Sequence, residues 1–163
     1  MSVFNDVVTS RPYTIEALQQ ILTFASQTEP ELFNSRPSIM NMMKQAGFKT
    51  FWITNQQTMT ERNTLLTAFS RQTDKQYYFN NDMAQSSRIY DEVVIAPFKE
   101  ALADPAEKKF IVVHLLGTHM RYEFRYPEDK AIFKGKDSLV PSNLKESQVE
   151  DYNAYDNAQH YND

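Results

Sequence analysis

Residues 37–55 read PSIMNMMKQAGFKTFWITN, and they predict a helix that ends at a glycine and is followed at once by a strand. Pro37 suits a first helical turn, where its missing N–H costs nothing, and Gly47 suits the left-handed position that ends many helices. Residues 48–55 form a short aromatic and β-branched run, which is typical of a buried strand. Helix, glycine and strand in succession are half of an α/β unit.

A second strand is predicted at 109–117, KFIVVHLLG, an apolar run of the kind buried on both faces of a parallel sheet. Helical patterns lie around these two strands. They cover 14–26, with apolar residues at helical spacing, 60–70, and 86–103, where Pro97 is expected to kink the helix. The sequence therefore favours an α/β fold with a mostly parallel sheet flanked by helices.

The remaining segments contribute little regular structure. Residues 120–145 contain proline and glycine turn signals and predict a long loop, which in a compact domain is often functional. Residues 146–163 are compatible with a helix. Two strong strands are few for an α/β sheet, so we expect residues 1–163 to be part of a larger domain.

Composition excludes several classes of protein. At 163 residues with 41% apolar content the chain suits a globular fold, and the absence of a Lys/Arg-rich block disfavours nucleic acid as a main partner. Without cysteine there can be no disulfide and no cysteine-ligated zinc site, but the lack of cysteine does not decide the cellular compartment. No apolar run approaches the roughly 18–20 residues of a membrane-spanning helix. The start, MSVFNDVVTSRPY, lacks a signal-peptide pattern, so the chain alone is expected to stay where it is made.

Candidate site residues follow the strands, because ligands in open α/β sheets bind beyond the carboxyl ends of the strands. Asn55 and Gln57 follow the first strand and His119 follows the second. Thr14 begins the first predicted helix. Its hydroxyl is either a simple N-cap or a group that meets a phosphate or sulfate at the positive helix end, where a metal or base could turn it into a nucleophile.

The three histidines divide by their surroundings. His119 comes just after a glycine at a strand end, where it could donate to a phosphate oxygen or protonate a leaving group, or could be an ordinary loop residue. His114 lies within the apolar strand and is interpreted as a structural residue, and His160 lies on a polar helix and is interpreted as solvated.

Several longer stretches carry a resemblance to a family. They are SRPYTIEALQQILTFA, PSIMNMMKQAGFKTFWITNQQTM, FSRQTDKQYY, VVHLLGTHMRYEFRYP and YDNAQHYND. The most specific pattern is H-x-x-G-[ST]-H followed by R-Y-P, after a KTFWxTNQ strand. On these residues the chain resembles the phosphoethanolamine transferases of the alkaline phosphatase/sulfatase superfamily, in particular the lipopolysaccharide-core (CptA-like) type.

The resemblance implies a reaction and a site. Thr14 matches the family's catalytic threonine, which contacts zinc and carries phosphoethanolamine taken from phosphatidylethanolamine before its transfer to a lipopolysaccharide core sugar. His119 matches the histidine that contacts the transferred phosphoryl group, and Asn55 and Gln57 lie near the same pocket. The family's catalytic domain is periplasmic and follows membrane-spanning helices in the inner membrane.

The same resemblance also marks what this chain lacks. The family takes further zinc ligands from an acidic residue upstream of the threonine and from an Asp-His pair far downstream, and neither is present here. We therefore expect an incomplete zinc site and an inactive isolated chain. Two other functions stay open: a sulfatase or phosphatase hydrolase, disfavoured because the C/S-x-P-x-R setting is missing, and a non-catalytic domain that binds an anion or a partner protein.

Overall fold

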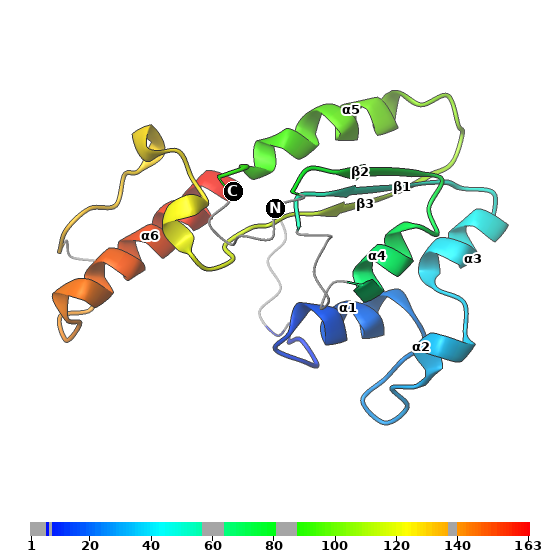
Figure 1. The fold of residues 1–163 in the computed structure, drawn as a ribbon, viewed down its shortest axis with the longest axis horizontal. Helices are drawn as coiled ribbons and strands as arrows, with labels where there is room; N and C mark the ends of the chain where they lie inside the picture. The colour runs from blue at the N-terminus through cyan, green and yellow to red at the C-terminus, as the bar shows by residue number, and fades with distance from the viewer. Residues whose placement is uncertain (1–5, 7, 57–63, 81–87, 137–139) are drawn as a thin grey trace. The chain divides into compact units, whose positions relative to one another are not determined.

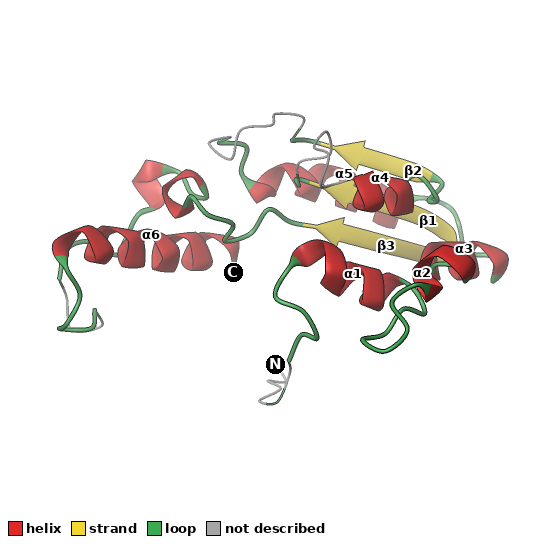
Figure 2. Ribbon diagram, turned by 60° about the horizontal axis from the view of Figure 1, so that its bottom comes forward, coloured by secondary structure: helices red, strands yellow, loops and turns green. Residues whose placement is uncertain are grey.

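A computed structural model describes residues 6, 8–56, 64–80, 88–136 and 140–163 and shows an α/β fold (Figure 1). Its sheet contains β1 (Lys49–Thr54), β2 (Lys75–Tyr78) and β3 (Lys109–His114) in the order β2-β1-β3. The bonds that flank β1 advance in step, from Lys49 N to Lys108 O and from Asn55 N to His114 O, so these strands are parallel. Figure 2 shows all three arrows pointing the same way. The predicted parallel α/β architecture is confirmed.

The described chain divides into two compact units, and each strand starts in the first unit and ends in the second. The first unit holds four helices, which are α1 (Thr14–Leu22), α2 (Leu32–Ser35), α3 (Ile39–Gln45) and α4 (Thr64–Ser70). Its core includes Met40, Phe51 and Trp52, which are almost completely buried. The aromatic strand that the sequence predicted at 48–55 is therefore a core element.

Helix α1 is shorter than the predicted 14–26 because Thr23 ends it. The Thr23 hydroxyl donates to Gln19 O at 2.6 Å and accepts the Ala25 N–H at 3.0 Å, while the Thr23 backbone is extended. A hydroxyl that bonds nearby backbone groups in this way competes with the next helical hydrogen bonds. The helix then packs against α4 within the same unit.

Helix α3 begins and ends close to the positions that the sequence indicates. Ser38 is its N-cap and accepts the Asn41 N–H at 3.3 Å, so Pro37 lies just before the helix rather than in its first turn. At the other end Gly47 has φ 81°, and its N–H donates to Lys44 O at 3.0 Å. The next N–H, of Phe48, reaches Met43 O at 3.0 Å, which completes a Schellman motif. The role predicted for Gly47 is confirmed.

Strand β2 was not predicted. It has only four residues, KQYY, and the first two are exposed, so it shows neither the length nor the apolar pattern of a buried strand. Hydrogen bonds that flank its pairing with β1 run from Asp74 N to Thr50 O and from Phe79 N to Thr54 O.

The second unit contains the 3-10 turns η2 (Asp91–Val94), η3 (Tyr122–Phe124) and η4 (Glu128–Lys130) and the helices α5 (Ile95–Ala103) and α6 (Glu146–Asn162). The predicted helix 86–103 begins later than expected, since residues 88–90 are not helical and 86–87 lie outside the described residues. Pro97 falls in the first turn of α5, where a missing N–H has no bond to lose, so the expected kink is wrong.

Helix α6 confirms the helix expected over 146–163, and it organises the loop before it. Asn157, almost fully buried, accepts the N–H groups of Ile132 and Phe133 at 2.8 and 2.9 Å and donates to Phe133 O at 3.0 Å. Asn153 donates to Gly135 O at 2.8 Å. Within the region predicted as a long loop, 120–145, the described residues are irregular apart from η3 and η4. No helix among the described residues has the length and apolarity needed to cross a membrane.

Candidate functional site

Thr14 is the first residue of α1, and its side chain is exposed. The N-cap is Tyr13, whose carbonyl accepts the Ala17 N–H at 3.0 Å and whose side chain makes no capping bond. The interpretation of Thr14 as a simple N-cap is therefore wrong. As the first helical residue, Thr14 lies at the end of α1 where the first-turn N–H groups have no helical partner and the helix dipole is positive.

His119 lies in the loop that follows β3 and is exposed. Its Nδ1 is 2.6 Å from Met120 O. A carbonyl oxygen can only accept, so Nδ1 carries the hydrogen and the second ring nitrogen, Nε2, is the one left to meet a ligand. Neutral, Nε2 is a base; protonated, it is a donor suited to a phosphate oxygen.

The other two histidines match their structural interpretations. His114 ends β3, and burial lowers its pKa to about 4, against the opposing charge of Asp91. It is therefore neutral near pH 7. His160 is exposed on α6, with its ring edge-on to Phe133 at 6.2 Å between ring centroids.

Asn55 follows β1, and its side chain is completely buried. The side-chain Nδ2 donates to Ile89 O at 2.8 Å and to Asp91 Oδ1 at 2.9 Å. Both donor hydrogens are therefore used inside the protein. Gln57, the other residue suggested after this strand, lies outside the described residues. Its neighbour Gln56 donates from Nε2 to Leu115 O at 2.9 Å, which joins the loops after β1 and β3.

Asp91 contacts both candidate loops and was not predicted from the sequence. It begins η2 and is buried, and besides Asn55 its carboxylate accepts the Leu116 N–H at 2.9 Å and the Gly117 N–H at 2.6 Å. The only signal in the sequence was an aspartate ahead of an apolar helical pattern, which is a common feature of helix starts. Because Asp91 accepts the Leu116 and Gly117 N–H groups, these two donors are not open to a phosphate.

Arg125 contacts the same loop and is only 3% exposed. Its Nε donates to His119 O at 2.8 Å. Burial lowers the pKa of the Arg125 guanidinium, and the negative charges of Asp91 and Glu123 act in the opposite direction. The loop after β3 is thus held from the Asp91 side and from the Arg125 side.

The structure brings together Asn55 and the His119 loop in the second unit, whereas Thr14 belongs to the first unit. No group of three or more His, Asp or Glu side chains in the described ranges could hold a metal ion. The described residues alone therefore do not form a complete zinc site.

Comparison with known proteins gives a match over the whole chain. The sulfatase family model matches residues 1–163. Phosphoethanolamine transferase EptC of Escherichia coli K12 is 63% identical over 163 residues, which are 100% of this chain and 28% of that protein. Phosphoethanolamine transferase CptA of Salmonella typhimurium is 65% identical over 158 residues, 97% of this chain and 27% of that protein. The chain thus spans less than a third of these relatives.

Solved structures show the same fold. The C-terminal periplasmic domain of E. coli EptC, crystallised in complex with Zn, is 64% identical with a TM-score of 0.92, over 98% of this chain and 44% of that one. The soluble domain of lipooligosaccharide phosphoethanolamine transferase A from Neisseria meningitidis is 16% identical with a TM-score of 0.64, over 91% of this chain and 44% of that one. The second likeness concerns the fold alone.

Proposed function

Because the chain belongs to the sulfatase family, we propose that it is part of the catalytic domain of a phosphoethanolamine transferase. The donor is phosphatidylethanolamine, the acceptor is a lipopolysaccharide core sugar, and the domain works in the periplasm beside the inner membrane. The observation that carries the proposal is the likeness to the zinc-bound EptC domain, with a TM-score of 0.92 at 64% identity.

Thr14 is the proposed nucleophile. Its Oγ1 attacks the phosphorus of the donor, the bond from phosphorus to the diacylglycerol oxygen breaks, and diacylglycerol leaves as an alcohol after taking up a proton. An acceptor oxygen then attacks the same phosphorus and displaces Thr14, which regains its proton. The exposed position at the start of α1 supports this role, since first-turn N–H groups and the helix dipole favour the charge on the phosphoryl oxygens.

His119 is the proposed contact to the transferred group. Because Nδ1 is engaged by Met120 O, a protonated ring has one free donor, Nε2–H, for a phosphoryl oxygen or for the departing alcohol. Asn55 is completely buried, so we propose that it acts by holding Asp91 through its hydrogen bond and does not contact the substrate. For Gln57 we keep the expected place near the pocket as a proposal.

Zinc binding is proposed with ligands from outside this chain, and Thr14 would supply one oxygen. When bound, the ion would lower the pKa of the threonine hydroxyl. Calorimetric titration of the 163-residue chain with Zn²⁺ tests the incomplete site: we expect no stoichiometric sub-micromolar binding. Stoichiometric binding at that affinity would contradict both the incomplete site and the expected inactivity of the chain alone.

The reaction is tested in a chimera in which this chain replaces the matching segment of E. coli EptC. After incubation with phosphatidylethanolamine, mass spectrometry should find phosphoethanolamine on the peptide that contains Thr14. The adduct should be absent in Thr14→Ala and present in Thr28→Ala, which removes an exposed loop threonine of the same type.

The same experiment separates the alternatives. Release of phosphoethanolamine to water at the rate of transfer would indicate a hydrolase. Full transfer by Thr14→Ala, or an adduct on another residue, would rule out the proposed nucleophile. No adduct on the unsubstituted chimera would leave the non-catalytic binding domain as the better interpretation.

A further inference from the structure

We infer that Asp91 is a positioning residue for the transfer reaction, because its buried carboxylate fixes the loop that carries His119. The inference rests on the proposed role of His119 and deepens it. Asp91 itself meets no substrate, since its two carboxylate oxygens are used by groups of the protein.

Three donors converge on the Asp91 carboxylate. Oδ1 accepts Asn55 Nδ2 and the Leu116 N–H, each at 2.9 Å, and Oδ2 accepts the Gly117 N–H at 2.6 Å. Asn55 is completely buried, so no water competes for its amide. Bonds from neutral donors to a buried charged acceptor are among the strong hydrogen bonds of proteins.

The loop between these contacts and His119 is short and closed. Gly117 has φ 59°, in the left-handed region that a residue with a side chain rarely adopts. Two residues later the His119 N–H donates to Leu116 O at 3.3 Å, and His119 O accepts Arg125 Nε at 2.8 Å. The backbone of His119 is therefore held on its N–H side by the segment that Asp91 binds and on its carbonyl side by Arg125.

This arrangement fixes a catalytic group before the ligand arrives. With the His119 backbone held and Nδ1 bonded to Met120 O, the ring keeps little freedom to lose on binding, so less entropy is spent in the reaction. A carboxylate is needed for this role. An amide in the same place has one acceptor oxygen, and its NH₂ group would oppose an N–H of Leu116 or Gly117 or the Nδ2 of Asn55.

Amide hydrogen exchange of the 163-residue chain, followed by NMR, tests the contacts. Asp91→Asn keeps the size of the side chain and should speed exchange of the Gly117 N–H on the order of 10- to 100-fold, the range expected for loss of a bond to a charged acceptor. The Lys49 N–H, which bonds Lys108 O, reports any change in stability that spreads beyond the loop, and its exchange should speed up by less than that of Gly117. Asp151→Asn, on the exposed face of α6, is the matched control and should change neither.

A double-mutant cycle in the E. coli EptC chimera tests the action through His119. Asp91→Asn should lower kcat on the order of 10- to 100-fold with little change in KM for the donor. The substitution misplaces His119, and His119 acts on the reacting phosphoryl group. Adding Asp91→Asn to His119→Gln should cause no further loss, because both changes remove one function. Asp151→Asn should keep the unsubstituted rate.

The two experiments fail separately. Unchanged exchange at Gly117 in Asp91→Asn would overturn the inference and leave the proposed function standing. Losses in kcat that multiply in the double variant would show that Asp91 acts on stability or on another group, and would also overturn the inference. Full activity of His119→Gln would overturn the proposed role of His119 and the inference built on it.

Discussion

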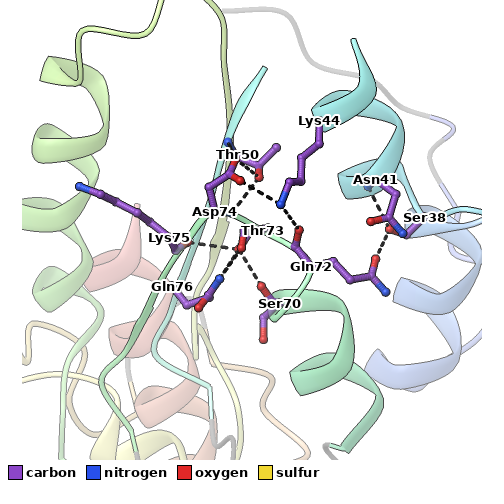
Figure 3. Close-up of polar contacts among 10 residues, drawn as sticks. All are labelled: Ser38, Asn41, Lys44, Thr50, Ser70, Gln72, Thr73, Asp74, Lys75 and Gln76. Carbon is purple, nitrogen blue, oxygen red and sulfur yellow. Dashed lines mark hydrogen bonds and ion pairs between the residues drawn. The ribbon is translucent and has the colours of Figure 1, made fainter. Parts of the chain in front are cut away.

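Two aspartates, each beside one end of β1, make similar numbers of hydrogen bonds in different surroundings. Asp74 accepts the Thr50 N–H and hydroxyl, each at 2.8 Å, and pairs with Lys44 at 2.9 Å (Figure 3). Its side chain is 34% exposed. Asp91 accepts three N–H donors and is 9% exposed. Water can therefore replace the contacts of Asp74 but not those of Asp91.

The difference follows from where each contact is made. Asp74 ties the start of β2 to the start of β1 and to α3, on a surface where solvent screens charge and hydrogen-bonds whatever is exposed. Around Asp91, loss of the carboxylate would leave backbone and side-chain donors without any partner. Stability and function should therefore depend far more on Asp91 than on Asp74.

The largest effect is expected for Asp91→Ala. It removes the acceptor of the Leu116 and Gly117 N–H groups and of one N–H of the Asn55 amide, and we expect the free energy of unfolding to fall by about 3–5 kcal/mol. Urea denaturation of the chain measures this. The matched variant Asp74→Ala should cost about 1 kcal/mol. An equal fall in the free energy of unfolding in Asp91→Ala and Asp74→Ala would contradict the expected difference between the two aspartates.

A second effect concerns His114, which ends β3 and interacts electrostatically with Asp91. Its pKa of about 4 lies below the ordinary 6.5, so the unfolded chain binds the proton more tightly and stability falls as pH drops from 6.5 to 4. The loss is at most about 3 kcal/mol, at 1.36 kcal/mol per pKa unit. His114→Gln should flatten the unfolding free energy between pH 6.5 and 4. A profile as steep as that of the unsubstituted chain would show that other groups cause the slope.

Much of this fold could be predicted from local sequence. The Schellman end at Gly47, the aromatic strand β1 and the apolar strand β3 each carry their signal within a few neighbouring residues. Strand β2 could not be predicted, because KQYY is short and half exposed. Local pattern also placed the end of α1 too late, since it does not show that the Thr23 hydroxyl bonds back to Gln19.

Less of the candidate site could be predicted, because some of its contacts join residues that are far apart in the sequence. His119 could be chosen from the sequence because it follows a strand and a glycine, and Thr14 because it starts a helix. Asp91 lies 25 residues from Leu116, and the contact between them exists only in the folded chain. Asn55 could be chosen for its place at a strand end, whereas its complete burial is visible only in the folded chain.

A smaller effect, in a different pH range, is expected at Asp74. Burial is the largest single influence and raises its pKa, but hydrogen bonds from Lys44 and Thr50 and the Lys44 charge outweigh it, and the pKa falls below 3.8. A lowered carboxylate pKa adds stability above the unfolded value that is lost as pH falls through the folded one. Asp74→Asn should cost about 1 kcal/mol at pH 7, discounted for exposure, and less at pH 2. Denaturation at the two pH values measures this, and an equal cost at both would contradict the assignment.

The smallest effect isolates the charge of Lys44 from the hydrogen bonds of Asp74. Lys44→Met keeps the apolar stem and removes the ion pair at 2.9 Å, and since the Lys44 side chain is 40% exposed we expect a cost of about 0.5 kcal/mol. The cost should shrink in 1 M salt, where the screening length is about 3 Å. Lys130→Met is the control, because Lys130 and Asp129 are 4.0 Å apart and more exposed. If the cost of Lys44→Met does not change with salt, the hydrogen bond from Lys44 Nζ to Gln72 O, and not the ion pair, holds α3 to the loop before β2.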